Sequence, residues 1–286
     1  MTSGSFHEAS TNYYKSKEFC TNDAQSIQTW FSCLKTTVFE FNVSGLSNIV
    51  SILDSLPILA KDKEKFAKLR AASGLCRIRT RHYLQAVHKF LEVDFSACSS
   101  ISEIIPPTSM VSLTVLSSLA FFSRHDIKNR VLTSLQFKRY LDLEPELREV
   151  IKYFLRNEYS LLISALEERR GYFLLNIYVH EHFDFLFNEI KRRAIMDYFK
   201  PFKSASLTIA AKAFSTTVAE LQSEICNLIS EGHLSARLDF ECKVLWSKKV
   251  DPRTQAHEKV QRLGQKYRRE IRTTLGMLRL QQARLA

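Results

Sequence analysis

Glycine and proline are scarce in this sequence, which has seven and six of them among 286 residues. Folds built from many short strands need these residues at their turns, so the scarcity indicates a mainly helical chain. Hydrophobic residues make up 45% of the sequence, which is enough for a continuous core and argues against wholesale disorder. At this length the chain can hold two domains, or one helical repeat array with a further domain at its end.

Motifs for nucleotide binding and for hydrolysis are also missing. The sequence has no G-x-x-x-x-G-K-[ST] and no G-x-G-x-x-G, the glycine-rich loops that hold phosphates, and no G-x-S-x-G nucleophile motif. Single Cys, His and Asp residues are scattered without a convergent pattern. We therefore expect no cofactor, no metal and no catalytic residues, which means that the protein is not an enzyme.

His180-Glu181-His182 raises the question of a metal site. An H-x-H begins the zinc motif of the JAMM isopeptidases, which continues after seven residues with Ser-x-x-Asp. Here those two positions hold Ile190 and Arg193, so a zinc ion would lose a carboxylate ligand and meet a cation. We predict that both histidines lie partly exposed at the start of a helix and bind no metal.

The six cysteines form no C-x-x-C pair and lie mostly among apolar residues, which is typical of buried thiols in a reducing compartment. The polar start of the chain predicts no secretory signal. Ile104–Ser123 has no charged residue, but Pro106, Pro107 and several Ser and Thr residues interrupt it. It therefore predicts a buried helix of about fifteen residues, and we expect no membrane span.

Charge is unevenly placed along the chain. Residues 248–286 hold eleven Lys and Arg against three acidic residues, so they carry +8 of the total net charge of +11. A basic end of this kind can contact nucleic acid or anionic lipid, or it can lie beside acidic helices of a partner. A solvated polar face without any partner is an equally simple interpretation.

Residues 204–249 have the pattern of a winged helix. Thr217–Glu231 begins with the spacing of a capping box and would be the helix that enters a nucleic-acid groove. It has three Glu and no Lys or Arg, so phosphates would repel it. Leu234–Asp239 and Lys243–Lys248 alternate as the two strands of the hairpin that follows. We expect this winged helix to bind proteins, and we do not expect nucleic acid as a partner.

The region before the winged helix consists of paired helical segments. In the clearest pair, Glu64–Arg79 and His82–Leu91, the small residues Ala71, Ala72 and Gly74 allow close approach. Hairpins of this type bury their apolar faces only when neighbours stack on them. Further helices are predicted at Ser5–Phe19, Ala24–Phe41, Gly45–Leu56, Thr108–Phe122, Asp126–Ser134, Leu147–Arg156 with Pro145 in its first turn, Glu158–Arg169, His180–Phe199 and Ser206–Phe214.

The last predicted helix, Pro252–Ala286, has apolar residues at three- and four-residue steps, which is typical of a seam that packs on partner helices. Two protein-binding surfaces follow from the pattern: the edge of the hairpin and this seam. The residues that we predict to bind partners are Leu234, Ala236, Leu238, Val244 and Trp246 in the hairpin and Val260, Leu263, Tyr267, Ile271, Leu275 and Leu278 in the seam.

These segments together predict a mainly α fold, in which a stack of TPR-like helical repeats precedes a winged helix and a C-terminal helix. The expected domains are residues 1–93 for the repeats, 94–250 for a domain with a helical part (94–203) and the winged helix (204–250), and 251–286 for the C-terminal amphipathic helix.

This layout resembles that of the PCI proteins, which are scaffold subunits of the COP9 signalosome, the proteasome lid and a translation initiation factor; residues 94–250 would be the PCI domain. Within the family the sequence is similar to the signalosome members. The resemblance begins within the helical repeats, so we expect an N-terminally shortened or divergent member. The similar segments keep the order of the family and are Tyr140–Ile151, Leu174–Tyr178, Ile190–Phe199, Ala213–Leu221, Leu228–Asp239 and Val250–Thr254.

The resemblance implies a non-catalytic scaffold subunit of a COP9 signalosome-like complex. Such a complex regulates cullin-RING ubiquitin ligases by removing Nedd8 from cullins, and its zinc chemistry belongs to another subunit. The partners would be other signalosome subunits, including neighbouring PCI subunits such as subunits 2 and 3, and a bundle of C-terminal helices. Contact with cullin-RING ligases would be indirect, and the protein would reside in the cytoplasm and the nucleus.

Two other functions stay open. The same fold occurs in the lid of the 26S proteasome, although its members match Ser235–Asp239 and Val250–Arg253 less well. The basic tail could instead serve a nucleic-acid-binding PCI adaptor in translation or messenger-RNA export, which would bind RNA with a strong dependence on salt.

Overall fold

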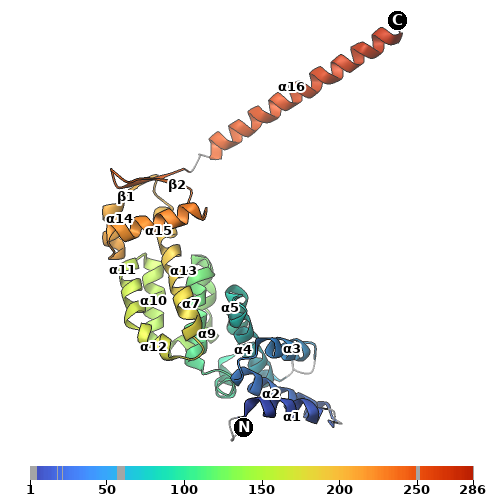
Figure 1. Cartoon of the computed structure of the whole chain (residues 1–286), viewed down its shortest axis with the longest axis vertical. Coiled ribbons are helices and arrows are strands. Elements are labelled where there is room, and N and C mark those ends of the chain that lie inside the picture. Colours follow the sequence, from blue (N-terminus) through green and yellow to red (C-terminus); the bar gives the residue numbers. More distant parts are fainter. Residues whose placement is uncertain (1–4, 18, 21, 57–61, 249–251, 286) are drawn as a thin grey trace. The chain divides into compact units, whose positions relative to one another are not determined.

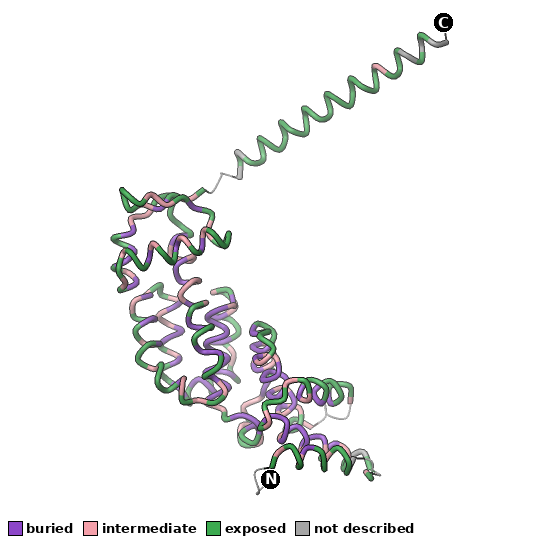
Figure 2. The backbone as a smooth tube through the Cα atoms, viewed as in Figure 1, coloured by how far each residue is buried: buried purple, intermediate pink, exposed green. Residues whose placement is uncertain are grey.

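The computed structural model describes residues 5–17, 19–20, 22–56, 62–248 and 252–285. Within these ranges the chain is built from helices and a three-stranded sheet, which confirms the predicted fold class (Figure 1). Buried residues follow the helices of the first two thirds of the chain, whereas the last helix is exposed along nearly all of its described length (Figure 2).

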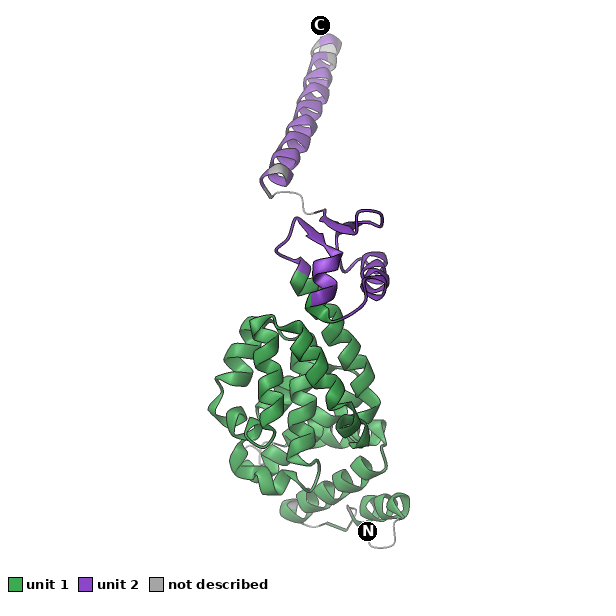
Figure 3. Ribbon diagram, turned by 90° about the vertical axis from the view of Figure 1, so that its left-hand side faces the viewer, with its two compact units in different colours: residues 1–198, 213–215 green, residues 199–212, 216–286 purple. Residues whose placement is uncertain are grey.

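The chain divides into two compact units (Figure 3). Unit 1 comprises residues 1–198 and 213–215, and unit 2 comprises residues 199–212 and 216–286. The predicted domain boundaries after residues 93, 203 and 250 stay predictions.

Consecutive helices from α1 to α5 contact each other, as the paired spacing predicts. Every one of them begins and ends within a few residues of its predicted bounds, because the apolar positions recur at helical steps up to each turn. They are α1 (Phe6–Lys17), α2 (Asp23–Phe39), α3 (Val43–Asp54), α4 (Lys63–Arg79) and α5 (Tyr83–Leu91).

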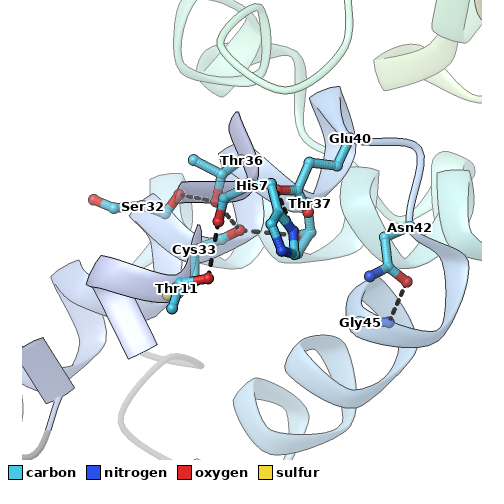
Figure 4. Close-up of polar contacts among 9 residues, drawn as sticks. All are labelled: His7, Thr11, Ser32, Cys33, Thr36, Thr37, Glu40, Asn42 and Gly45. Carbon is cyan, nitrogen blue, oxygen red and sulfur yellow. Dashed lines mark hydrogen bonds and ion pairs between the residues drawn. The ribbon is translucent and has the colours of Figure 1, made fainter. Parts of the chain in front are cut away.

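Polar side chains around the α2–α3 turn are hydrogen-bonded to the backbone (Figure 4). Thr36 and Thr37 are buried, and their hydroxyls donate to the Cys33 carbonyl at 2.8 and 2.9 Å. The side-chain oxygen of Asn42 accepts a hydrogen bond from the backbone N–H of Gly45 at 3.1 Å and so caps α3. Because the buried hydroxyls keep partners, α2 and α3 pack together without a large desolvation penalty.

Small residues let α4 and α5 approach closely. Ala71, Ala72 and Gly74 of α4 are buried, and the Phe90 ring of α5 is fully buried against Gly74. A Cβ atom added to Gly74 would overlap that ring. The close approach predicted from these residues is therefore confirmed.

Helix α7 (Pro107–Phe121) is buried from Ser109 to Ala120 and contacts α5 and the later helices α9 and α10. This result confirms the buried helix predicted for the uncharged segment. No helix in the described part of the chain is long and apolar enough to cross a membrane. The other elements between α5 and the winged helix are η2 (Phe95–Ala97), α6 (Cys98–Ile101), α8 (Arg124–Asp126), η3 (Ile127–Leu132), α9 (Leu135–Leu141), α10 (Pro145–Arg156), α11 (Tyr159–Glu168), α12 (Arg170–Leu175) and α13 (His180–Phe199).

Short elements are where the sequence prediction differs from the structure. The segment Asp126–Ser134 is not one α-helix, because α8 changes into the π-helical turn η3 after three residues. Helices α9 and α12 were not predicted, since one or two turns show too few repeats of the apolar spacing. By contrast, Pro145 begins α10 as expected, because proline fits the first helical position.

An aromatic and histidine cluster joins α5, α7 and α13 within unit 1. The Tyr83 ring stacks on Phe121 and Phe185, with ring centroids 5.5 and 5.4 Å apart, and its hydroxyl is hydrogen-bonded to His182 Nδ1 at 3.1 Å. His182 is only 5% exposed, so the expectation that it is partly exposed is wrong, whereas His180 is exposed. Sequence spacing could not place Tyr83 beside it, because the two residues are 99 positions apart.

The H-x-H segment therefore contributes a packing residue to unit 1. Arg193, at the position of the missing carboxylate, donates to the Leu119 carbonyl at 3.2 Å and lies over the Phe154 ring. Among the described residues, no three His, Cys, Asp or Glu side chains form a group that could hold a metal ion.

The winged helix follows α13 and belongs to unit 2 except for residues 213–215. The three strands are antiparallel in the order β1-β3-β2. Strand β1 was not predicted, because three residues show too little alternation. The elements of this region are β1 (Ser204–Ser206), α14 (Leu207–Phe214), α15 (Val218–Ser230), β2 (Ala236–Asp239) and β3 (Val244–Ser247), and α16 (Pro252–Leu285) comes after them.

The buried His182 predicts a pH-dependent stability. Burial lowers the pKa of this imidazole; Glu181 raises it, and Arg79 and Arg81 lower it again, leaving it below its ordinary value. The unfolded state then binds the proton more tightly, so the stabilisation is complete above about pH 6.5 and is lost as the pH falls from there towards the folded pKa.

Thermal unfolding between about pH 7.5 and pH 5.5 tests this prediction. We expect the fall in Tm to be smaller in His182→Gln than in the unchanged chain, because glutamine can still bond Tyr83 but does not titrate. The matched control His257→Gln, in the exposed tail, should keep the full pH dependence. An equal fall in Tm in all three proteins would contradict the prediction.

The α4–α5 contact predicts the effect of one methyl group. Gly74→Ala forces the Phe90 ring to move in a packed core, and we expect a loss of about 1–3 kcal/mol in the free energy of unfolding. Gly171→Ala is the control, because a Cβ atom there meets nothing within 4 Å. Urea denaturation measures both changes, and equal stabilities for the two variants would show that α4 and α5 are not packed this tightly.

Candidate protein-binding surfaces

The solvent face of α15 is acidic, as the sequence predicts. Glu220 and Glu224 are exposed on it. The predicted capping box is present: the Thr217 hydroxyl accepts from the Glu220 N–H at 3.3 Å, and the Thr217 N–H donates to the Glu220 carboxylate at 3.4 Å. Because phosphates repel such a surface, α15 is not suited to a nucleic-acid groove. The buried side of α15 consists of Leu221, Ile225 and Leu228.

Strand β2 forms an open edge of the sheet. Lys248 N donates to the Ser235 carbonyl at 2.9 Å. Bonded and non-bonded pairs alternate along an antiparallel ladder, so the backbone of Arg237 faces β3 while the backbones of Ala236 and Leu238 face the open edge. Ala236 N also donates to the Leu234 carbonyl at 3.1 Å, which makes Leu238 the better placed donor for an added strand.

The sequence analysis placed Val244 and Trp246 of β3 on the open edge of the hairpin, and this part of the prediction is wrong. Val244–Ser247 is the central strand, because Ala205 of β1 pairs with Leu245 on the side opposite to β2. Both backbone sides of β3 are therefore occupied. Val244 is half-buried, and the Trp246 side chain, 53% exposed, is what β3 can offer to a partner.

The other hairpin residues differ in what they can offer. The Ala236 side chain is buried against the fold, so this residue can act only through its backbone. Leu234 and Leu238 are half-buried, and Leu234 precedes the strand. The structure thus places Leu238 and Trp246 best for binding, and the role of the whole set in partner binding stays a prediction.

A shallow aromatic hollow lies on the outer face of the hairpin. Arg237 and Trp246 are register partners, and Phe240 is exposed in the turn beside them. Aromatic side chains and arginine are the residue types that contribute most to protein interfaces. The sequence analysis did not single out Phe240, although an aromatic residue between the two predicted strands is a usable signal. The hollow measures about 800 Å³ and is lined by Arg237, Leu238, Asp239, Phe240, Glu241 and Trp246.

The seam of α16 is exposed along its length. All six predicted positions are exposed by 48 to 66%, and they recur at three- and four-residue steps on one side of the helix. The stripe is narrow and polar residues border it, which is typical of a seam between helices. The seam residues are Val260, Leu263, Tyr267, Ile271, Leu275 and Leu278.

Two family models match the chain. The model of the 26S proteasome subunit RPN7 matches residues 1–130, and that of the PCI domain matches residues 166–249. The second match covers the end of α11, the helices α12 to α15 and the sheet, which agrees with the resemblance seen in the sequence.

Curated relatives extend the similarity to nearly the whole chain. COP9 signalosome complex subunit 1 of Arabidopsis thaliana is 30% identical over 95% of this chain and 62% of its own length. Subunit 1b of Drosophila melanogaster is 29% identical over 95% of this chain and 53% of its own length. A 26S proteasome non-ATPase regulatory subunit 6 homolog of Arabidopsis thaliana is 23% identical over 82% of this chain and 60% of its own length.

The chain therefore spans between half and two thirds of the length of these relatives. The identity and the share of this chain that is matched are higher with these two signalosome subunits than with the proteasome subunit, in the order that the sequence motifs predict. With an RPN7-type helical region before it, this chain carries a PCI domain and is similar to COP9 signalosome complex subunit 1 along nearly its whole length.

Proposed function

We propose that this chain is a non-catalytic scaffold subunit of a COP9 signalosome-like assembly. The observation that carries the proposal is the exposed apolar seam of α16, on a chain similar to signalosome subunit 1. An exposed stripe of this kind is stabilised only when another surface covers it, because apolar burial contributes roughly 25 cal/mol per Å². The helix thus requires partners in order to bury its own apolar residues.

The winged helix would provide a second binding surface. An extended segment of a neighbouring subunit could add to the open edge of β2 at Leu238, and the Trp246 ring could fill an apolar pocket of that neighbour. Such an edge gives main-chain hydrogen bonds, and the aromatic ring gives specificity. Edge and seam together would hold the chain at two points, which suits a scaffold.

The family resemblance supplies the partners in this proposal. They are other signalosome subunits, including neighbouring PCI subunits such as subunits 2 and 3, and a bundle of C-terminal helices that α16 would join. The assembly would remove Nedd8 from cullins by means of a zinc site on another subunit, so that contact with cullin-RING ligases is indirect. We propose residence in the cytoplasm and the nucleus for the same reason.

A second candidate is a subunit of the 26S proteasome lid. The match of residues 1–130 to the RPN7 model favours it, as does the lower but extended similarity to regulatory subunit 6. Both functions use the same two surfaces, so only the identity of the bound subunits separates them.

Purification of the tagged chain from cells, with identification of the bound proteins and a Nedd8–cullin cleavage assay on the eluate, tests the proposal. We expect signalosome subunits and cleavage that zinc chelation abolishes. Signalosome subunits without cleavage would support the scaffold role and show that the recovered assembly is inactive. Recovery of proteasome-lid subunits would assign it to the second candidate, and recovery of neither set would overturn the proposed function.

We predict that a change in the seam weakens assembly and leaves the fold of the chain intact. Leu275→Asp with Leu278→Asp places two carboxylates in the surface to be buried, and we expect recovery of the partner subunits to fall at least about tenfold. Because both side chains are exposed in the free chain, its Tm should change little.

Gln265→Asp with Thr273→Asp is the matched control, since it adds the same charge on the opposite side of α16. We expect this pair to leave recovery of the partners almost unchanged. Equal recovery of partners by the seam variant and by the control would show that the seam is not a binding surface.

A further inference from the structure

The two borders of the α16 seam differ in their charge pairing. The border that includes Lys259, Lys266 and Glu270 has an ion pair within the helix, because Lys266 lies 3.9 Å from Glu270. Glu270 also precedes the seam residue Ile271 directly. This border therefore carries charges of both signs, and one of its two lysines is paired.

The opposite border is a row of arginines. Arg268, Arg272 and Arg279 each follow a seam residue by one position, which places them about 100° around the helix from it. All three are exposed, and none forms an ion pair with a carboxylate in the described part of the chain. Arg268 and Arg272 are four residues apart, a spacing at which like charges repel on a helix surface.

We infer that α16 selects an acidic helix: its partner carries carboxylates along the flank that faces Arg268, Arg272 and Arg279. This inference rests on the proposed function, in which α16 joins other helices through its seam. Guanidinium groups bind carboxylates through two parallel hydrogen bonds, which a lysine cannot do. The repulsion within the row is relieved when a partner supplies the missing negative charge.

The spacing of the row predicts the spacing of the carboxylates. With a rise of about 1.5 Å per residue, Arg268 and Arg272 lie about 6 Å apart along the axis, and Arg279 lies about 10 Å further on. Acidic residues one turn apart and then two turns further along a partner helix would match them. Charges beside a seam set the choice and the orientation of the partner, so the row would give α16 its specificity.

Other occupants fit this surface less well. A second copy of α16 would bring another strongly basic helix against the row, because residues 248–286 carry a net charge of +8. An anionic membrane favours a broad apolar face with aromatic anchors, whereas this stripe is narrow and has Glu270 on its border. RNA could pair with the arginines but would leave the six seam residues uncovered.

Binding of the full chain to two synthetic helices tests the inference. Both peptides match α16 in length and carry leucine along a seam; one has glutamate on its flanks, and its twin has glutamine. By fluorescence anisotropy at about 0.1 M salt, we expect the glutamate peptide to bind the full chain about fivefold or more tightly than its twin. Arg268→Gln with Arg279→Gln should remove that preference.

The control Arg262→Gln with Arg269→Gln removes the same charge from the face opposite to the seam and should keep the preference. Equal affinity of the unchanged chain for both peptides, or an equal loss of preference in both variants, would overturn the inference. So would tighter binding to poly(U) RNA or to phosphatidylserine vesicles than to the glutamate peptide.

These results separate the inference from the proposed function. If the chain binds both peptides equally and Leu275→Asp abolishes that binding, the seam is a helix-binding surface and only the role of the arginine row is wrong. If neither peptide binds and partner subunits are not recovered from cells, the proposed function fails as well.

Discussion

The apolar seam of α16 is the constraint on which this account depends. A helix gains little from exposing a line of leucine, isoleucine, valine and tyrosine side chains to water, and most helical stability comes from packing of that line. In the free chain those residues are about half exposed or more. By contrast, α7 is enclosed over twelve consecutive residues from Ser109 to Ala120. Neighbouring helices of the chain thus cover α7, whereas the proposed function requires a partner to cover the seam of α16.

The winged helix has a second uncovered surface, which consists of backbone groups at the edge of its sheet. Its acidic α15 does not suit phosphates, while its sheet keeps an open edge at β2 and an exposed Trp246. Strand β3 lies between β1 and β2 and pairs with both of them. A further strand can therefore be added only at an outer strand of the sheet. The proposed scaffold function rests on these two surfaces, the open edge of β2 and the seam of α16.

Local signals made much of the fold predictable. Helix α13 begins and ends where its apolar spacing predicts, Pro145 begins α10, and the capping box at Thr217 forms with Glu220. Features that depend on distant contacts were not predictable: the burial of His182 against Tyr83, the central place of β3, and the short helices α9 and α12. The seam was predictable as a pattern, whereas its exposure required the structure.

The most direct test of the central claim is amide hydrogen exchange of α16 in the isolated chain and in the assembly recovered from cells. If the seam needs a partner, the amides of Val260–Leu278 should exchange rapidly in the isolated chain and become strongly protected in the assembly, whereas those of α7 should be protected in both. Equal protection of α16 in the two samples would contradict the claim, because the helix would then be stable without a surface that covers its seam.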